Sequence, residues 1–170
     1  AALLAHHALP HAETAATVAR LDLLVPLAWH LRQRNTRRAL KLVEEAYAML
    51  VHARLAQRVV AAYTARLRMV RAEAQWLLSE VKTALVFIDR AIIKFSALDD
   101  QTGLADAYWL RGWVAMKQGD AILRDLEWEH ALDCASKAQD ADRMIFIESA
   151  QARFAVLHHL PSALQRFAPR

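Results

Sequence analysis

Glycine, proline and cysteine are scarce in this sequence, which has three Gly, four Pro and one Cys among 170 residues. β-Hairpins and phosphate-binding loops need glycine and proline for their tight turns, so this scarcity argues against a sheet fold, and Gly-rich phosphate motifs are absent. The single cysteine, Cys134, excludes an internal disulfide and fits a reducing compartment, so we expect a cytoplasmic location. The longest apolar run, residues 23–29, is far shorter than the roughly 20 residues of a membrane-spanning helix, so we expect no membrane span.

Residues that favour helices fill the segments between these rare breaks, and 56% of all residues are hydrophobic. Apolar side chains recur at three- and four-residue spacing through nearly the whole chain, which predicts amphipathic helices packed into an all-α fold. About seven helices are predicted. The first spans residues 13–34 with a kink at Pro26, the second follows Asn35-Thr36, the third spans 54–78, and the fourth is capped by Ser79 and ends in the turn 99–103. The last three span 104–118, 120–138 and 143–159, and Pro161 ends the seventh.

The helices are expected to form pairs that repeat along the chain. The segments LAWHLRQRNTRRAL, AEAQWLLSEVKTAL and RGWVAMKQGDAILR each contain a helix end, a polar turn and the start of a second helix. They align at offsets of about 45 and 40 residues, a spacing typical of stacked helical repeats. Short connections make neighbouring helices antiparallel, so we predict one domain of about three and a half helix pairs over residues 1–170.

Two longer phrases, LAWHLRQRNTRRALKLVEEA and LDDQTGLADAYWLRGWVAMKQGD, resemble the tetratricopeptide family over about residues 20–135. The matching positions are a small residue in the first helix (Ala28, Gly112), the Gly119-Asp120 turn, and a small residue in the second helix (Ala39, Ala84). The resemblance implies a right-handed α-solenoid. More narrowly, the phrases resemble the N-terminal region upstream of GGDEF diguanylate cyclase domains in proteobacterial signalling proteins. No GGDEF signature is present, so any cyclase activity would belong to a further domain.

In the register of that family, the inner face of the second and third repeats forms a candidate groove for a partner or ligand. Its residues are Arg66, Met69, Glu73, Trp76, Asp106, Trp109, Trp113 and Lys117. Tryptophan and arginine are common in binding hot spots, but the same tryptophans could instead belong to the core. The register also places Arg68, Arg71 and Arg111 between helices, so either their stems lie along the surface or the register is wrong by one residue.

No catalytic, cofactor or metal site is predicted. His6, His7, His11 and Glu13 are the densest group of metal-ligand types, but Pro10 interrupts them, and we expect residues 1–12 to be flexible. His158 and His159 lie beside Pro161, and residues 161–170 are expected to link to a further C-terminal domain. No His, Ser or Cys lies at a spacing that would indicate acid/base catalysis with Glu44, Glu45, Glu127 or Glu129. Cys134 is expected to be a small buried residue and not a nucleophile.

The charge of +4 is unevenly distributed: +7 over residues 1–98, −6 over 99–148 and +3 over 149–170. Basic residues cluster at 32–41 and 54–71, but aromatics do not interleave with them, so we expect no nucleic-acid partner. We expect a non-catalytic regulatory module that binds a protein partner or its own output domain. Two alternatives stay open, a small-molecule effector sensor and a homo-oligomerisation module in which basic and acidic halves meet.

Overall fold

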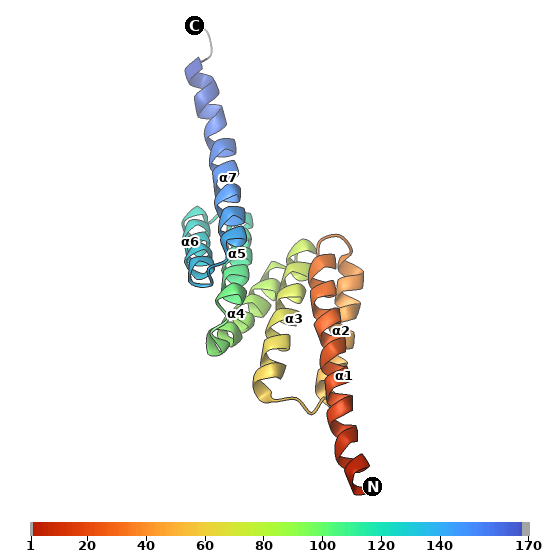
Figure 1. The fold of residues 1–170 in the computed structure, drawn as a ribbon. Coiled ribbons are helices and arrows are strands. Elements are labelled where there is room, and N and C mark those ends of the chain that lie inside the picture. Colours follow the sequence, from red (N-terminus) through yellow and green to blue (C-terminus); the bar gives the residue numbers. More distant parts are fainter. Residues whose placement is uncertain (1, 168–170) are drawn as a thin grey trace.

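In a computed structural model, the backbone is described for residues 2–167 and the side chains for residues 13–156. This part of the chain contains seven α-helices and no strand, which confirms the predicted all-α fold (Figure 1). The helices are α1 (Ala2–Leu31), α2 (Thr36–His52), α3 (Gln57–Leu77), α4 (Val81–Leu98), α5 (Gln101–Lys117), α6 (Ala121–Lys137) and α7 (Ala141–Phe167).

Successive helices pack as the pairs α1/α2, α3/α4 and α5/α6, and α7 follows against α6. Helix α3 contacts both α1 and α5, so the odd-numbered helices lie side by side on one side of the stack. The pairs follow one another across Figure 1, and α1 and α7 extend from opposite ends of the stack. This order brings side chains about 40 residues apart in sequence to the same surface.

Four turns in the second part of the chain have the same geometry. Ser79, Asp99, Gly119 and Gln139 all have positive φ, between 55° and 81°, and follow one another at intervals of 20 residues. The N–H of the next residue donates to a carbonyl five residues back in each case, at 2.8–3.0 Å, which satisfies the helix end. The predicted cap at Ser79 is therefore wrong by one residue, because Ser79 takes the left-handed position and Glu80 is the N-cap of α4.

Several helix boundaries also differ from prediction. Helix α5 begins at Gln101, so residues 101–103 are helical and do not belong to the turn, and α3 begins at Gln57 and not at residue 54. Helix α1 begins at Ala2 and not near residue 13, and α7 continues through Pro161 to Phe167. Proline removes one backbone hydrogen bond and does not by itself end a long helix. The side chains of His6, His7, His11, His158 and His159 lie outside the described residues. The flexibility of residues 1–12 and the linker role of residues 161–170 stay predictions.

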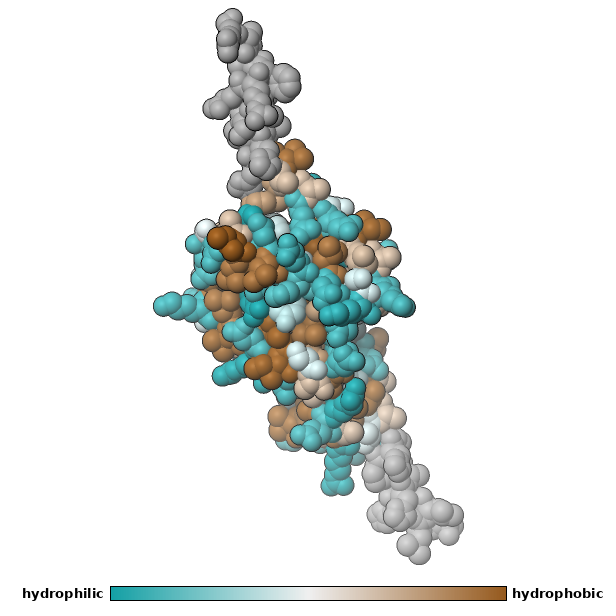
Figure 2. Space-filling model, turned by 90° about the vertical axis from the view of Figure 1, so that its left-hand side faces the viewer, coloured by the Kyte–Doolittle hydropathy of each residue, from teal (hydrophilic) through white to brown (hydrophobic). Residues whose placement is uncertain are grey.

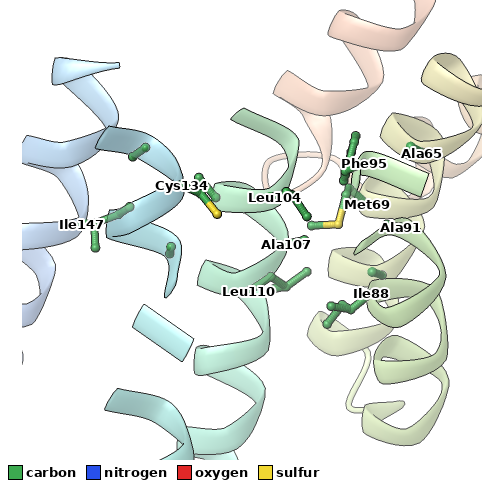
Figure 3. Close-up of a cluster of buried hydrophobic side chains, with 14 of the residues drawn as sticks. Ala65, Met69, Ile88, Ala91, Phe95, Leu104, Ala107, Leu110, Cys134 and Ile147 are labelled. Atoms are coloured by element: carbon green, nitrogen blue, oxygen red, sulfur yellow. The ribbon is translucent and has the colours of Figure 1, made fainter. Parts of the chain in front are cut away.

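The core consists of two clusters that meet at α3. One cluster joins α1, α2 and α3 around Leu21, Val43 and Val70. The other runs from α3 to α7, and Figure 3 shows Met69, Phe95 and Leu104 meeting within it, with Cys134 on the far side of α5. Cys134 is buried, as predicted, and burial raises the pKa of its thiol.

Small residues bring the paired helices close together. Ala28, Ala39 and Ala84 are fully buried at the positions where the sequence predicted small side chains. Gly112 faces the ring of Trp128 from α6, and a Cβ added at this glycine would lie 2.3 Å from that ring. Trp128 is itself 1% exposed, so α5 and α6 pack closely because residue 112 lacks a side chain.

Candidate functional site

The odd-numbered helices enclose a groove with a cavity of about 400 Å³ at its centre. Helices α1, α3, α5 and α7 all contribute to its wall. The lining residues are Trp29, Arg32, Gln33, Met69, Glu73, Trp76, Leu77, Asp106, Trp109, Leu110, Trp113, Phe146, Ala150 and Arg153. A second cavity of about 290 Å³ shares Trp29, Arg32, Asp106, Trp109 and Phe146, and continues the groove toward the first turn of α7. We call the two cavities together the groove.

Aromatic rings form most of the apolar wall. Trp109 packs edge-on against Trp113 at 5.6 Å between ring centroids and against Phe146 at 5.3 Å. Trp76 lies 6.5 Å from Trp113. Behind them, the buried Trp128 stacks on Trp109 at 5.0 Å. Trp76, Trp109 and Trp113 are only half-buried, so each is supported by the core on one side and borders the cavity on the other.

Ion pairs between odd-numbered helices hold the groove together on its polar side. Arg32, in the turn directly after α1, pairs with Glu73 from α3, while its neighbour Gln33 donates to the same carboxylate. The Arg32 guanidinium also lies 3.7 Å from the centre of the Trp29 ring, a cation–π contact that fixes both side chains. The pair Arg32–Glu73 thus ties α1 to α3 directly beside the tryptophans.

Asp106 on α5 joins the next two helices. It accepts from Arg66 on α3 at 2.9 Å and from Arg143 on α7 at 2.9 Å. Burial raises the pKa of Asp106, and the charges of Arg143 and Arg66 oppose that rise. Arg66 also pairs with Asp100 at 2.9 Å. The carboxylate of Asp106 is therefore committed to holding three helices in place.

Six of the eight residues predicted for the groove line it, and two do not. The six are Met69, Glu73, Trp76, Asp106, Trp109 and Trp113. Arg66 lies outside the lining and pairs with Asp106. Lys117 is exposed at the end of α5 and donates to the Ser79 hydroxyl at 3.1 Å, away from both cavities. The two open interpretations of the tryptophans are both partly right, since these rings pack on the core and border the groove.

The prediction missed the contributions of α1 and α7. Phe146, Ala150 and Arg153 lie 40 residues after Asp106, Leu110 and Trp113, so extending the repeat offset by one more helix would have found them. Trp29 and Gln33 precede Met69 and Glu73 by 40 residues, so the same offset carried back to the first repeat would have found them, whereas the aligned turns of these two repeats are about 45 residues apart. Arg32 lies 40 residues before Ala72, which does not line the groove, so the offset does not mark Arg32.

The arginines predicted between helices do lie there, with their charged ends bonded. Arg68 donates to the Arg90 carbonyl at 3.2 Å, and Arg71 lies 5.4 Å from the centre of the Phe87 ring. Arg111 pairs with the buried Glu127 at 2.8 Å. These side chains therefore pack along the helix surfaces, and no shift of register is needed to explain them.

The other candidates from the sequence form no second site in the described part of the chain. Residues 13–156 hold no group of three His, Cys, Asp or Glu side chains close enough to bind a metal ion. Glu127 is buried in its pair with Arg111, and Glu45 pairs with Arg20 on the surface. Among the described helices, none combines the length and apolarity needed to cross a bilayer.

Comparisons with protein-family models, curated proteins and solved structures find no match to this chain.

Proposed function

We propose that this chain is a non-catalytic binding module that recognises a ligand or partner segment in the groove. The observation that carries the proposal is the set of partly exposed tryptophans, Trp76, Trp109 and Trp113, around one cavity. Exposing large aromatic surface to water is unfavourable, and tryptophan is enriched where proteins bind partners. A volume of about 400 Å³ falls in the range of small-molecule sites.

The wall of the groove is built to keep its shape. The ion pairs Arg32–Glu73 and Asp106–Arg143 connect α1 to α3 and α5 to α7 across it. A preorganised site loses less entropy on binding than a mobile one. Because four helices share the wall, a bound ligand would contact all four and favour the packing seen here over alternatives, which is a route from binding to regulation.

The resemblance to regions upstream of GGDEF domains supports a more specific setting. In that setting the chain is the regulatory N-terminal part of a cytoplasmic bacterial signalling protein, such as a diguanylate cyclase, and acts on its own output domain or on a protein partner. The chain itself supplies recognition and no chemistry. Robust cyclase or hydrolase turnover by residues 1–170 would contradict this.

Tryptophan emission tests the proposed binding function directly, because the reporter rings line the groove. The chain is titrated with a panel of metabolites and short peptides, and a saturable change in emission is expected for at least one of them. Replacing Trp109 by Ala should abolish that response, whereas Ile122→Ala, an exposed change on α6 outside the groove, should leave it intact. A panel without any saturable response would remove the support for a binding function.

Self-association is a second candidate, favoured by charge and by exposed apolar side chains. Residues 1–98 carry +7 and residues 99–148 carry −6. On the acidic part, Ile122 is 85% and Leu126 47% exposed, one turn apart on α6. Hydrophobic side chains are interspersed with hydrophilic ones on the face seen in Figure 2. Sedimentation at low and high salt tests this candidate, since a monomer at both salt concentrations would eliminate it.

A further inference from the structure

This inference rests on the proposed binding function and concerns the charge of the ligand. Nearly all charged groups of the groove are neutralised within the protein. Arg32 pairs with Glu73, and Arg143 pairs with both Asp106 and Asp140. A ligand gains little from groups that already have partners, because it would have to break those pairs. The charges left without a partner therefore determine which ligand fits.

Arg153 is the cation of the larger cavity that lacks a partner. No carboxylate in the described residues lies within ion-pair distance of it. Residues 1–12 and 157–170 contain no Asp or Glu, so the described part of the chain holds every acidic side chain. Arg153 is exposed and belongs to the lining of the cavity, so its guanidinium is available to a ligand there.

Helix α7 places Arg153 next to an apolar surface. Phe146, Ala150 and Arg153 follow one another at four- and three-residue spacing, so they share one face of the helix. All three line the same cavity as Trp76 and Trp113. The cavity thus offers one cation without an ion-pair partner among the described side chains, beside aromatic rings and beside charged groups that are already paired.

The groove also has one negative charge without an ion-pair partner in the described part of the chain, on Asp142, but it lies too far from Arg153 to neutralise the charge of that arginine. Asp142 lines the smaller cavity and forms no ion pair in the described residues. It precedes Arg153 by 11 residues on the same helix, which corresponds to about 16 Å along the axis. At physiological ionic strength the screening length is about 8 Å, so each of the two charges acts on its own surroundings.

We propose that the larger cavity binds a small apolar carboxylate, an organic acid whose hydrocarbon body contacts Trp76, Trp113 and Phe146 while its carboxylate pairs with Arg153. A single planar guanidinium matches a carboxylate with two parallel hydrogen bonds. The volume of about 400 Å³ suits a body of one or two rings. The assignment excludes amines and neutral alcohols of the same shape as preferred ligands.

Three probes that share a phenyl ring and a three-carbon chain test the charge preference. Phenylpropionate, phenylpropanol and phenylpropylamine are titrated into the chain, and tryptophan emission and calorimetry report binding. The carboxylate is expected to bind about tenfold or more tightly than the amine, since a tenfold ratio requires only about 1.4 kcal/mol. Equal binding of all three probes would overturn the charge inference and leave the proposed binding function standing.

Variants of the arginine locate the effect. Arg153→Gln is expected to bring the three affinities close together, and Arg153→Lys to keep part of the preference for the carboxylate. The matched control is Arg90→Gln, which removes an exposed arginine of α4 that does not line the groove. A preference that survives in Arg153→Gln would overturn the assignment. Circular dichroism of each variant verifies that the helices are intact.

A peptide separates a free organic acid from the end of a protein chain. A short peptide of leucine and phenylalanine with a free C-terminal carboxylate is compared with its amide. Binding of this peptide about a hundredfold tighter than phenylpropionate would identify a chain end as the ligand and overturn the proposal of a small molecule. Failure of all probes, together with a response to other members of the metabolite panel, would overturn this inference alone.

Discussion

At the scale of single residues, two glycines of the same helix pair serve different purposes. Gly112 lies under the ring of Trp128, where no Cβ fits. Gly119 has open space around it and a φ of +81°, a conformation that side chains rarely adopt. The sequence predicted both as small or turn residues, but only the structure separates the steric reason from the conformational one.

Substitution of each glycine by alanine should show this difference. Gly112→Ala is expected to destabilise the fold by about 1–3 kcal/mol, because the buried Trp128 has to move. Gly119→Ala should cost about 1 kcal/mol through backbone strain, and Gly119→Asn less, since asparagine tolerates the left-handed region. Urea denaturation measures each change. A neutral Gly112→Ala variant would contradict the close approach of α5 and α6.

Tyr63 should report the contact between α3 and α1 through its titration. Its pKa is raised to about 12, chiefly by burial and then by the 2.6 Å hydrogen bond to Asp22 and by that carboxylate's charge. The folded pKa lies above the ordinary value of 10.0, so the stabilising contribution is present below about pH 10 and is lost as the pH rises through about 12. The difference between the phenolate absorbance of wild type and Tyr63→Phe isolates this group.

Asp22→Asn separates the causes of that shift. The pKa of Tyr63 should fall, because the negative charge is gone, yet stay above 10.0, because burial is the larger cause. A phenol that titrates at its ordinary value in wild type would show that α1 and α3 do not meet at this point.

At the scale of the helices, the turns explain which boundaries the sequence could predict. Asp100, Asp120 and Asp140 each cap a helix by accepting from the N–H three residues later, at 2.7–3.0 Å. Aspartate and glycine in such turns are strong local signals, and the predicted starts of α6 and α7 are within two residues of the structure, whereas the start of α5 is three residues earlier than predicted. Ser79 misled the prediction because serine is a common cap, whereas here it takes the left-handed position before Glu80.

A better N-cap residue should stabilise α4, whose present N-cap, Glu80, is weak. Glu80 forms no side-chain hydrogen bond at the N-terminus of α4, unlike the aspartates at the three later turns. Glu80→Asp is expected to stabilise the fold by about 0.5–1 kcal/mol, and Asp120→Ala to cost about 1 kcal/mol. Chemical denaturation gives both values. Equal stability of Glu80→Asp and Glu80→Ala would show that the cap contributes nothing here.

At the scale of the whole molecule, helical periodicity predicted the helices well, but it predicted only in part which faces of the helices line the groove. Met69 and Trp109 could be assigned to the groove because repeats two and three share a 40-residue offset. Trp29, 40 residues before Met69, was missed because the turns of the first and second repeats align at an offset of about 45. A local pattern identifies a helix and its apolar stripe, but the partner of that stripe depends on contacts distant in sequence.

The two core clusters should give the stack two regions of partly independent stability. Leu21→Ala opens a cavity in the cluster around α1 and α2, at an expected cost of about 2–5 kcal/mol. Hydrogen exchange should then accelerate more in α1 and α2 than in α5 and α6, because each helix pair depends mainly on its neighbours. Ile88→Ala, in the other cluster, is the counterpart and should affect α4 and α5 more. Uniform acceleration in both variants would indicate a single cooperative unit.

The four turns at 20-residue intervals make the second part of the chain modular. Residues 100–139 begin at the aspartate cap of one turn and end at Gln139, the left-handed residue two turns later. A tandem copy inserted after Gln139 would therefore begin and end with the backbone conformation already present there. The copied Gly103–Lys117 segment would take the place that α7 now occupies against α6. The array could therefore lengthen by duplication of one 40-residue cassette, with the ligand-facing wall growing by one helix at each step.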